Sequence, residues 1–266
     1  MANKTSRRAF LKFSTLTGVA SVLYADQTFA KDLADIAASV IDNKKSLVFL
    51  FQGDSITDGN RGRNKDPNHI MGHGYAFSVA SRVGADFAES NHVFYNRGIS
   101  GHRVQDLQKR WQTDTLDIKP DVLSILIGIN DTSMLINKPV VEDADIDLFE
   151  TTYRDILEQS KQQNPDTLFV LCLPFVYAVS KVKDNWEKYS STVAKLTERV
   201  KKLAAEFNGV VVDFPAVFDR ASKRAPIEYW MWDGIHPTVS GHELMAREWI
   251  KQVSSRLKFL RIYKYK

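Results

Sequence analysis

Five short apolar runs alternate with longer stretches whose apolar residues recur at helical spacing. The runs span residues 47–51, 93–96, 122–127, 168–173 and 210–213, and the helical stretches span residues 104–111, 148–163, 186–207 and 239–253. Strands joined through helices pair mostly in parallel, because each helix returns the chain to the end of the sheet at which the previous strand began. We therefore predict an α/β fold with a mostly parallel five-stranded sheet, in a chain long enough to cover both faces with helices.

The first thirty residues are expected to stand apart from this fold. Arg7 and Arg8 precede an apolar stretch, residues 13–24, that is too short to cross a bilayer, and small-residue sites follow near Ala30. The pattern predicts a twin-arginine export signal over residues 1–30, with a Sec-type signal or an uncleaved anchor as alternatives. We expect residues 31–266 to form one domain that is exported, periplasmic or secreted, with no integral membrane segment after signal cleavage.

Charge and cysteine content exclude several classes of function. Without residues 1–30 the net charge falls from +4 to +1, because that segment holds four basic and one acidic side chains. A nucleic-acid partner is therefore not expected. Cys172 is the only cysteine, so the chain forms no internal disulfide, and its place in an apolar run predicts a buried thiol. No histidine and cysteine cluster has zinc-ligand spacing, and we expect neither a metal nor a cofactor.

Polar residues gather where the predicted strands end, which is where open parallel sheets bind their ligands. Ser55 follows the first strand, and Asp233 and His236 lie just before the last helix. A serine hydroxyl needs a base to take its proton, and an imidazole oriented by a carboxylate is the usual base. We predict Ser55 as nucleophile, His236 as general acid and base, and Asp233 as the carboxylate that orients His236.

Acyl transfer through a serine also needs hydrogen-bond donors for the oxyanion of the tetrahedral intermediate. The backbone N–H of Ser55, the backbone N–H of Gly98 and the side-chain amide of Asn130 are the predicted donors. Glycine leaves room for substrate, and an asparagine amide donates without competing as a base.

These motifs, in this order, make the chain resemble the SGNH, or GDSL, hydrolase superfamily. The matching blocks are Gly-Asp-Ser at 53–55, the glycine at 98, Gly-x-Asn-Asp at 128–131 and Asp-x-x-His at 233–236. Stretches such as "NRGISGHRVQDLQKRW" and "WDGIHPTVSGHELMAREW" are similar to bacterial acetylxylan esterases of this superfamily. The resemblance covers residues 47–253. It implies a three-layer α/β/α, flavodoxin-like fold, no metal, and removal of O-acetyl groups from an oligo- or polysaccharide.

Other interpretations of the same residues stay open. Ser55 could cap a helix, and Ser100 is a rival serine, although its flanking glycines favour a role in shaping the oxyanion loop. Asp54 and Asp131 are expected to fix their loops through backbone hydrogen bonds. A lysophospholipase or thioesterase is the alternative enzyme, and a carbohydrate-binding protein without catalysis is the alternative outside enzymes.

Trp232 and His73 are the predicted substrate-binding residues. Trp232 directly precedes Asp233, and an aromatic ring at the site suits stacking on a sugar, while His73 lies between two glycines of a long irregular stretch. The other histidines, 69, 92, 102 and 242, are expected at the surface or behind the site. Trp111 is expected to serve core packing or an oligomer contact, so whether the chain forms a homo-oligomer stays open.

Overall fold

The structure is a computed structural model that describes residues 46–64 and 66–265. The predicted export signal, residues 1–30, lies outside the described residues, and export stays a prediction. Within the described part, no helix is both long enough and apolar enough to cross a membrane.

The sheet has five strands in the order β2-β1-β3-β4-β5, and every neighbouring pair is parallel. The strands are β1 (Val48–Gly53), β2 (Val93–Asn96), β3 (Val122–Leu126), β4 (Leu168–Cys172) and β5 (Val210–Val212). The predicted α/β fold with a parallel five-stranded sheet is thus confirmed, and the predicted strand ends agree with the observed ones to within a residue or two.

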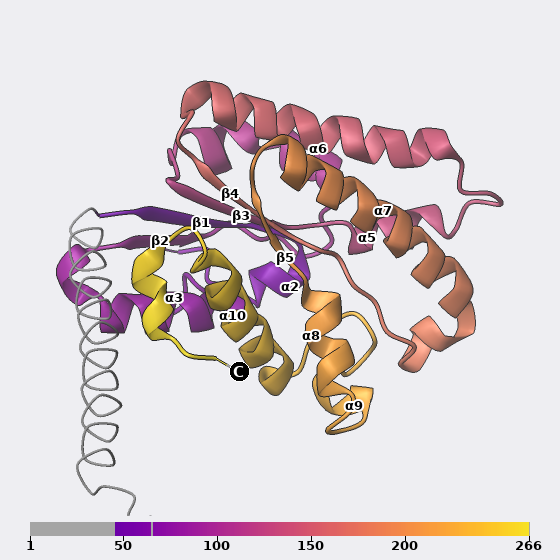
Figure 1. The fold of residues 1–266 in the computed structure, drawn as a ribbon. Coiled ribbons are helices and arrows are strands. Elements are labelled where there is room, and N and C mark those ends of the chain that lie inside the picture. Colours follow the sequence, from indigo (N-terminus) through magenta and orange to yellow (C-terminus); the bar gives the residue numbers. More distant parts are fainter. Residues whose placement is uncertain (1–45, 65, 266) are drawn as a thin grey trace, which may run out of the picture. The chain divides into compact units, whose positions relative to one another are not determined.

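Helices cover both faces of this sheet (Figure 1). They are α2 (Ser55–Asp58), α3 (Tyr75–Asp86), η1 (Ala88–Ser90), α4 (Val104–Lys109), η2 (Gln112–Leu116), α5 (Ile129–Leu135), α6 (Asp143–Gln163), η3 (Ser180–Asn185), α7 (Trp186–Glu206), α8 (Phe214–Ala221), α9 (Ile227–Trp230), α10 (Val239–Val253) and η4 (Lys258–Ile262). Side chains of α3, α8 and α10 form one apolar cluster with the sheet, and those of α4, α6 and α7 form the other. The chain therefore has three layers, α/β/α.

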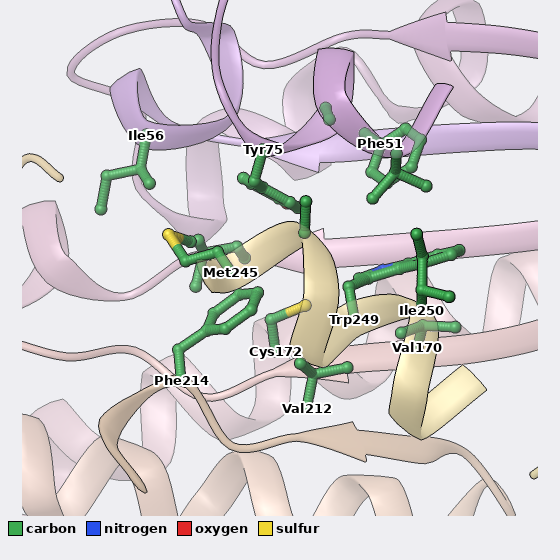
Figure 2. Close-up of a cluster of buried hydrophobic side chains, with 14 of the residues drawn as sticks. Phe51, Ile56, Tyr75, Val170, Cys172, Val212, Phe214, Met245, Trp249 and Ile250 are labelled. Atoms are coloured by element: carbon green, nitrogen blue, oxygen red, sulfur yellow. The ribbon is translucent and has the colours of Figure 1, made fainter. Parts of the chain in front are cut away.

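Aromatic and aliphatic side chains pack together in the cluster between the sheet and helices α3 and α10 (Figure 2). Phe51 of β1 lies edge-on to Tyr75 of α3, and its ring is 5.4 Å from that of Trp249 of α10. The Trp249 indole donates to Ser124 Oγ at 2.9 Å, so its one polar atom is satisfied. Cys172 is fully buried here, as predicted, and burial raises the pKa of its thiol to about 12. Burying a large apolar side chain such as Phe51 stabilises the fold by about 1.5 to 3 kcal/mol.

Two helices differ from the sequence-based expectation for local reasons. α6 begins at Asp143 rather than at residue 148, because the Glu142 N–H donates to Asp145 Oδ2 at 3.1 Å and fixes an earlier first turn. α4 ends at Lys109, and Trp111 just beyond it is buried, with its indole N–H donating to Ser160 Oγ at 3.1 Å. Of its two predicted roles, the Trp111 side chain therefore serves core packing.

Helix α3 has no counterpart in the sequence-based prediction. Its N-cap is Gly74, which has no side chain to announce a helix start, and the Tyr75 N–H is capped instead by His242 Nδ1 at 3.1 Å. A cap supplied from 167 residues away leaves no local signal in the sequence.

Candidate active site

The loops that follow β1, β2 and β3 lie side by side, because β1 is between β2 and β3 and all three strands run in the same direction. The Ile99 N–H donates to the Gly53 carbonyl at 3.1 Å, which joins the second loop to the first. The Asn130 side-chain amide donates to the His102 carbonyl at 3.1 Å, which joins the third loop to the second. The carboxyl ends of the strands therefore bring together Ser55, Asn130 and the segment around Gly98, as the sequence predicts.

Ser55 is the first residue of the short helix α2. Asp54 caps this helix, since its Oδ1 accepts the Ile56 N–H at 3.0 Å. Ser55 itself keeps a half-buried side chain and makes no cap, which answers the alternative that it serves only as a helix cap. The strand-to-helix turn thus leaves the Ser55 hydroxyl free to meet a partner from elsewhere in the chain.

That partner is His236. Ser55 Oγ lies 2.8 Å from His236 Nε2, and His236 Nδ1 lies 2.7 Å from Asp233 Oδ2. Ser55 is 181 residues away from His236 in sequence, so the fold alone brings the predicted trio into one hydrogen-bonded row. Such a row can pass the hydroxyl proton to the imidazole while the carboxylate holds the ring in the required tautomer.

Asp233 is held as a carboxylate by its own turn. Its Oδ1 accepts the backbone N–H of Ile235 at 2.9 Å and that of His236 at 2.7 Å, while Oδ2 faces the imidazole. Partial burial acts to raise the pKa of Asp233, but the hydrogen bonds from the His236 N–H, the imidazole and the Ile235 N–H outweigh burial and lower it. The Asp233 carboxylate thus holds the imidazole through Nδ1 and leaves Nε2 facing Ser55.

The predicted oxyanion donors differ in whether their N–H groups are free to bind a substrate. The Gly98 N–H is buried and already donates to Asn96 Oδ1 at 2.9 Å, so it has no hydrogen left to offer a substrate. Gly101, three residues on, has φ +83°, is exposed, and would point an added Cβ into open space. Asn130, half-buried, uses one amide hydrogen on His102 and keeps a second. Among the described contacts, neither the Ser55 nor the Gly101 N–H has a protein acceptor.

Asp58 is a site residue that sequence reasoning missed. Its carboxylate, 3% exposed, accepts both the Ser100 N–H at 3.0 Å and the Ser100 hydroxyl at 3.1 Å, and it pairs with Arg63 at 2.7 Å. Ser100 is thereby committed to shaping its loop, as expected, and not to nucleophilic attack. Its position in the sequence could have indicated a role at the site, because Asp58 ends the one-turn helix that Ser55 begins.

Asp54 and Asp131 are both buried and both accept backbone hydrogen bonds, as predicted, but Asp54 acts within its own loop, whereas Asp131 binds the start of α4. Asp54 Oδ1 accepts the Ile56 N–H, and Asp131 Oδ1 accepts the Val104 N–H at 3.2 Å. The second carboxyl oxygen of each is buried without a partner among the described residues. Burial raises the pKa of both groups to about 7, and the charge of Asp131 adds to the rise at Asp54.

The two predicted substrate-binding side chains are both exposed. Trp232 is 65% exposed, and its ring stacks on that of His236 with centroids 6.0 Å apart and planes 25° apart. His73 is exposed in the loop before α3. Of the remaining histidines, His69 is exposed, His92 and His102 are half-buried, and His242 is buried.

Residues 46–64 and 66–265 contain no group of three or more His, Cys, Asp or Glu side chains arranged to hold a metal ion. Around Ser55 the acidic side chains are individually engaged, with Asp233 on His236 and Asp58 on Arg63 and Ser100.

Comparison with known proteins places this geometry in a family. Residues 51–244 match the GDSL-like Lipase/Acylhydrolase family, and this span includes Ser55, Asn130, Asp233 and His236. The chain belongs to this family. As a GDSL-family protein it is an esterase or acylhydrolase, that is, a carboxylic ester hydrolase.

Several members of the GDSL family are similar over most of the chain. An acetylxylan esterase from Geobacillus stearothermophilus is 33% identical over 208 residues, which cover 77% of this chain and 92% of the relative. A solved structure of that esterase superposes with a TM-score of 0.69, covering 81% of this chain and 98% of the other. A structure described as a GDSL-like lipase from Parabacteroides merdae has 37% identity and a TM-score of 0.74, covering 79% and 97%.

Proposed function

We propose that this GDSL-family esterase removes O-acetyl groups from an oligo- or polysaccharide through an acyl-enzyme on Ser55. The observation that carries the proposal is the hydrogen-bonded row from Ser55 Oγ to His236 Nε2, at 2.8 Å, and from His236 Nδ1 to Asp233 Oδ2, at 2.7 Å. The 33% identity to an acetylxylan esterase supports the choice of acyl group and substrate class.

In the proposed first half-reaction, Ser55 Oγ attacks the acetyl carbonyl carbon while His236 Nε2 takes the hydroxyl proton. The carbonyl oxygen becomes an oxyanion, and the imidazolium is stabilised by the Asp233 carboxylate. His236 then gives the proton to the sugar oxygen as the carbon–oxygen ester bond breaks. In the second half-reaction water replaces the sugar, loses its proton to His236, and releases acetate with Ser55 restored.

Three donors are proposed for the oxyanion: the N–H groups of Ser55 and Gly101 and the free amide hydrogen of Asn130. Gly101 replaces Gly98 in this role, because the Gly98 N–H donates to Asn96. The positive φ of Gly101 turns the loop so that its exposed backbone stands next to His102, whose carbonyl holds the Asn130 amide. Preorganised donors cost no reorganisation during the reaction, and each typically contributes about 2.7 to 4 kcal/mol.

Trp232 is proposed to bind the carbohydrate. Its exposed ring stacks on the His236 ring, so a sugar bound against the indole would lie close to the catalytic imidazole. The alternatives are a lysophospholipase or thioesterase, which would need to bind a long acyl chain, and a binding protein without turnover.

The test compares acyl groups and leaving groups on the purified protein. Hydrolysis of p-nitrophenyl acetate, butyrate and octanoate gives acyl-chain preference, and acetylated xylo-oligosaccharides are compared with lysophosphatidylcholine. We expect acetate to be favoured by about 10- to 200-fold in kcat/KM for each misfit group, and acetylated sugars to outpace the lipid. Equal turnover of octanoyl esters or of the lysophospholipid would favour the lipid-directed alternative, and no turnover of any ester would favour the binding protein.

A further inference from the structure

His242 is a buried histidine that the proposed reaction does not use. It lies on α10, the helix that follows His236, and is only 9% exposed. Its Nδ1 accepts the backbone N–H of Tyr75 at 3.1 Å and so caps the start of α3. The Gly74 N-cap has no side chain that could do this, so α3 depends on an acceptor from a different helix.

The segment held by His242 also packs against the helix that begins at Ser55. The His73 N–H donates at 2.9 Å to the carbonyl of Gly59, the residue that caps the end of α2. A Cβ added to Gly74 would lie 3.1 Å from the Ile56 carbonyl oxygen and 3.2 Å from His242 Cε1. A side chain at Gly74 would therefore crowd both α2 and the His242 ring.

The His242 ring is held in the form that can accept a hydrogen bond. Nδ1 must be unprotonated to accept the Tyr75 N–H, which leaves the ring proton on Nε2. Burial lowers the pKa of His242 to about 4, and positive charge on His73 or His236 acts in the same direction. The imidazole thus keeps its acceptor through the neutral pH range.

We propose that His242 is a positioning residue, which by accepting the Tyr75 N–H presses residues 72–74 against α2 and so fixes Ser55 relative to His236. His242 lies on α10, which begins directly after the catalytic turn, while α2 begins with the nucleophile. The hydrogen bond from the Tyr75 N–H to His242 therefore links the two segments whose separation sets the 2.8 Å contact between Ser55 Oγ and His236 Nε2. This inference rests on the proposed role of Ser55.

His92 provides a matched control. Its Nδ1 likewise accepts a backbone N–H, that of Leu47, at 3.1 Å, and burial lowers its pKa too. His92 and Leu47 immediately precede β2 and β1, so they lie at the amino ends of the strands, opposite the edge that carries Ser55. Replacing either histidine by leucine removes the same kind of hydrogen bond, but only one of the two holds α2.

The experiment measures kcat and KM for p-nitrophenyl acetate, with melting temperature, for His242→Leu, His242→Asn, His92→Leu and His92→Asn. We expect both leucine variants to melt at a lower temperature. Only His242→Leu should lose kcat, by about 10- to 100-fold, since small displacements of reacting groups have effects of this size. KM should change less than about threefold, and His242→Asn, whose Oδ1 can replace Nδ1 as acceptor, should recover most of kcat.

A kcat for His242→Leu within about twofold of that for His92→Leu would overturn the inference, as would failure of asparagine to restore any of the loss. If His242→Leu does not fold, Gly74→Ala is used with Gly84→Ala as its control. The Cβ at Gly84 meets only Phe94, at an ordinary 3.6 Å, whereas the Cβ at Gly74 would push α2 and His242 apart. Equal kcat in these two variants would also overturn it. Substantial turnover by Ser55→Ala would instead refute the proposed function, so the two failures are distinguishable.

Discussion

Asp58 Oδ2 accepts hydrogen bonds from both the backbone N–H and the hydroxyl of Ser100, and so joins the helix that Ser55 begins to the loop that follows β2. The carboxylate has 3% exposure and also pairs with Arg63. Two loops that need a fixed separation for catalysis are thereby held by one buried group. The proposed oxyanion donor Gly101 is the residue directly after Ser100.

The first prediction is that Asp58→Asn lowers kcat for p-nitrophenyl acetate by at least about tenfold. An amide accepts through only one oxygen, so the bonds to Ser100 and Arg63 cannot all persist, and the donor at Gly101 shifts. Glu150→Gln is the control, because Glu150 is equally buried, at 6% exposure, and pairs with Arg154 and Lys202 on the far side of the sheet. Both variants should melt earlier, and equal kcat in the two would contradict the role given to Asp58.

The second prediction concerns Asn130. Asn130→Ala should reduce kcat by about 10²- to 10³-fold with little change in KM, since the lost amide acts mainly on the oxyanion of the transition state. Asn130→Asp, which has the same shape and no donor, should be at least as slow. Asn137→Ala removes an exposed amide that donates to the Ser133 carbonyl near the end of the same helix, and it should leave kcat unchanged. A tenfold or smaller loss in both Asn130 variants would remove the amide from the oxyanion site.

The site was partly predictable because its chemistry is confined to short motifs. Ser55, Asp233 and His236 each occur in a motif of a few residues, and a parallel sheet brings strand ends together whatever the details of packing. Gly98 shows the limit of such reasoning. Its motif position suggested a donor, but the hydrogen bond that engages its N–H comes from the conformation of Asn96, which no spacing rule conveys.

The fold shows the same division between local and distant signals. Long periodic segments such as α7 and α10 were predicted with their observed limits to within a residue. Helix α3 was not, because its cap is His242, and the ties that Asp58 makes to Ser100 likewise cross 42 residues of sequence. Contacts of this kind depend on the finished fold, and one sequence by itself carries no trace of them.

The third prediction concerns the pH dependence of stability. Burial raises the pKa of Asp54 from 3.8 to about 7, so the folded state holds a proton that the unfolded state has lost across that interval. The stability contributed by this group is fully present below about pH 4 and is lost as the pH rises through about 7. Asp54→Asn removes this titrating group. The free energy of unfolding of the variant, relative to that of wild type, should therefore increase with rising pH by on the order of 3 to 4 kcal/mol.

Urea unfolding of wild type and Asp54→Asn at intervals from pH 4 to pH 8 measures this difference. The difference between the two proteins is the relevant quantity, because carboxylates with lowered pKa, such as Asp106 at about 2, titrate alike in both. Asp131→Asn should show the same trend, since burial raises its pKa to about 7 as well. A difference that stays constant across this range would show that Asp54 is ionised in the folded protein throughout.

The fourth prediction separates sugar binding from chemistry. Trp232→Ala should raise KM for acetylated xylo-oligosaccharides by about tenfold, the loss expected from one aromatic stacking contact, and should leave kcat for p-nitrophenyl acetate nearly unchanged. Tyr229→Ala is the control, since Tyr229 is also exposed, at 57%, but packs edge-on to Trp230 and not on His236. Unchanged KM in the Trp232 variant would place the carbohydrate elsewhere.

The role of Ser55 as nucleophile is tested by the turnover number of Ser55→Ala on p-nitrophenyl acetate. The variant loses one oxygen from a half-buried position, so its melting temperature should stay close to that of wild type. We predict that kcat falls by roughly 10⁴- to 10⁶-fold, as losses of a serine nucleophile do. A folded Ser55→Ala protein that keeps more than about a hundredth of wild-type kcat would exclude Ser55 as the nucleophile, because the ester bond would then be broken by another group.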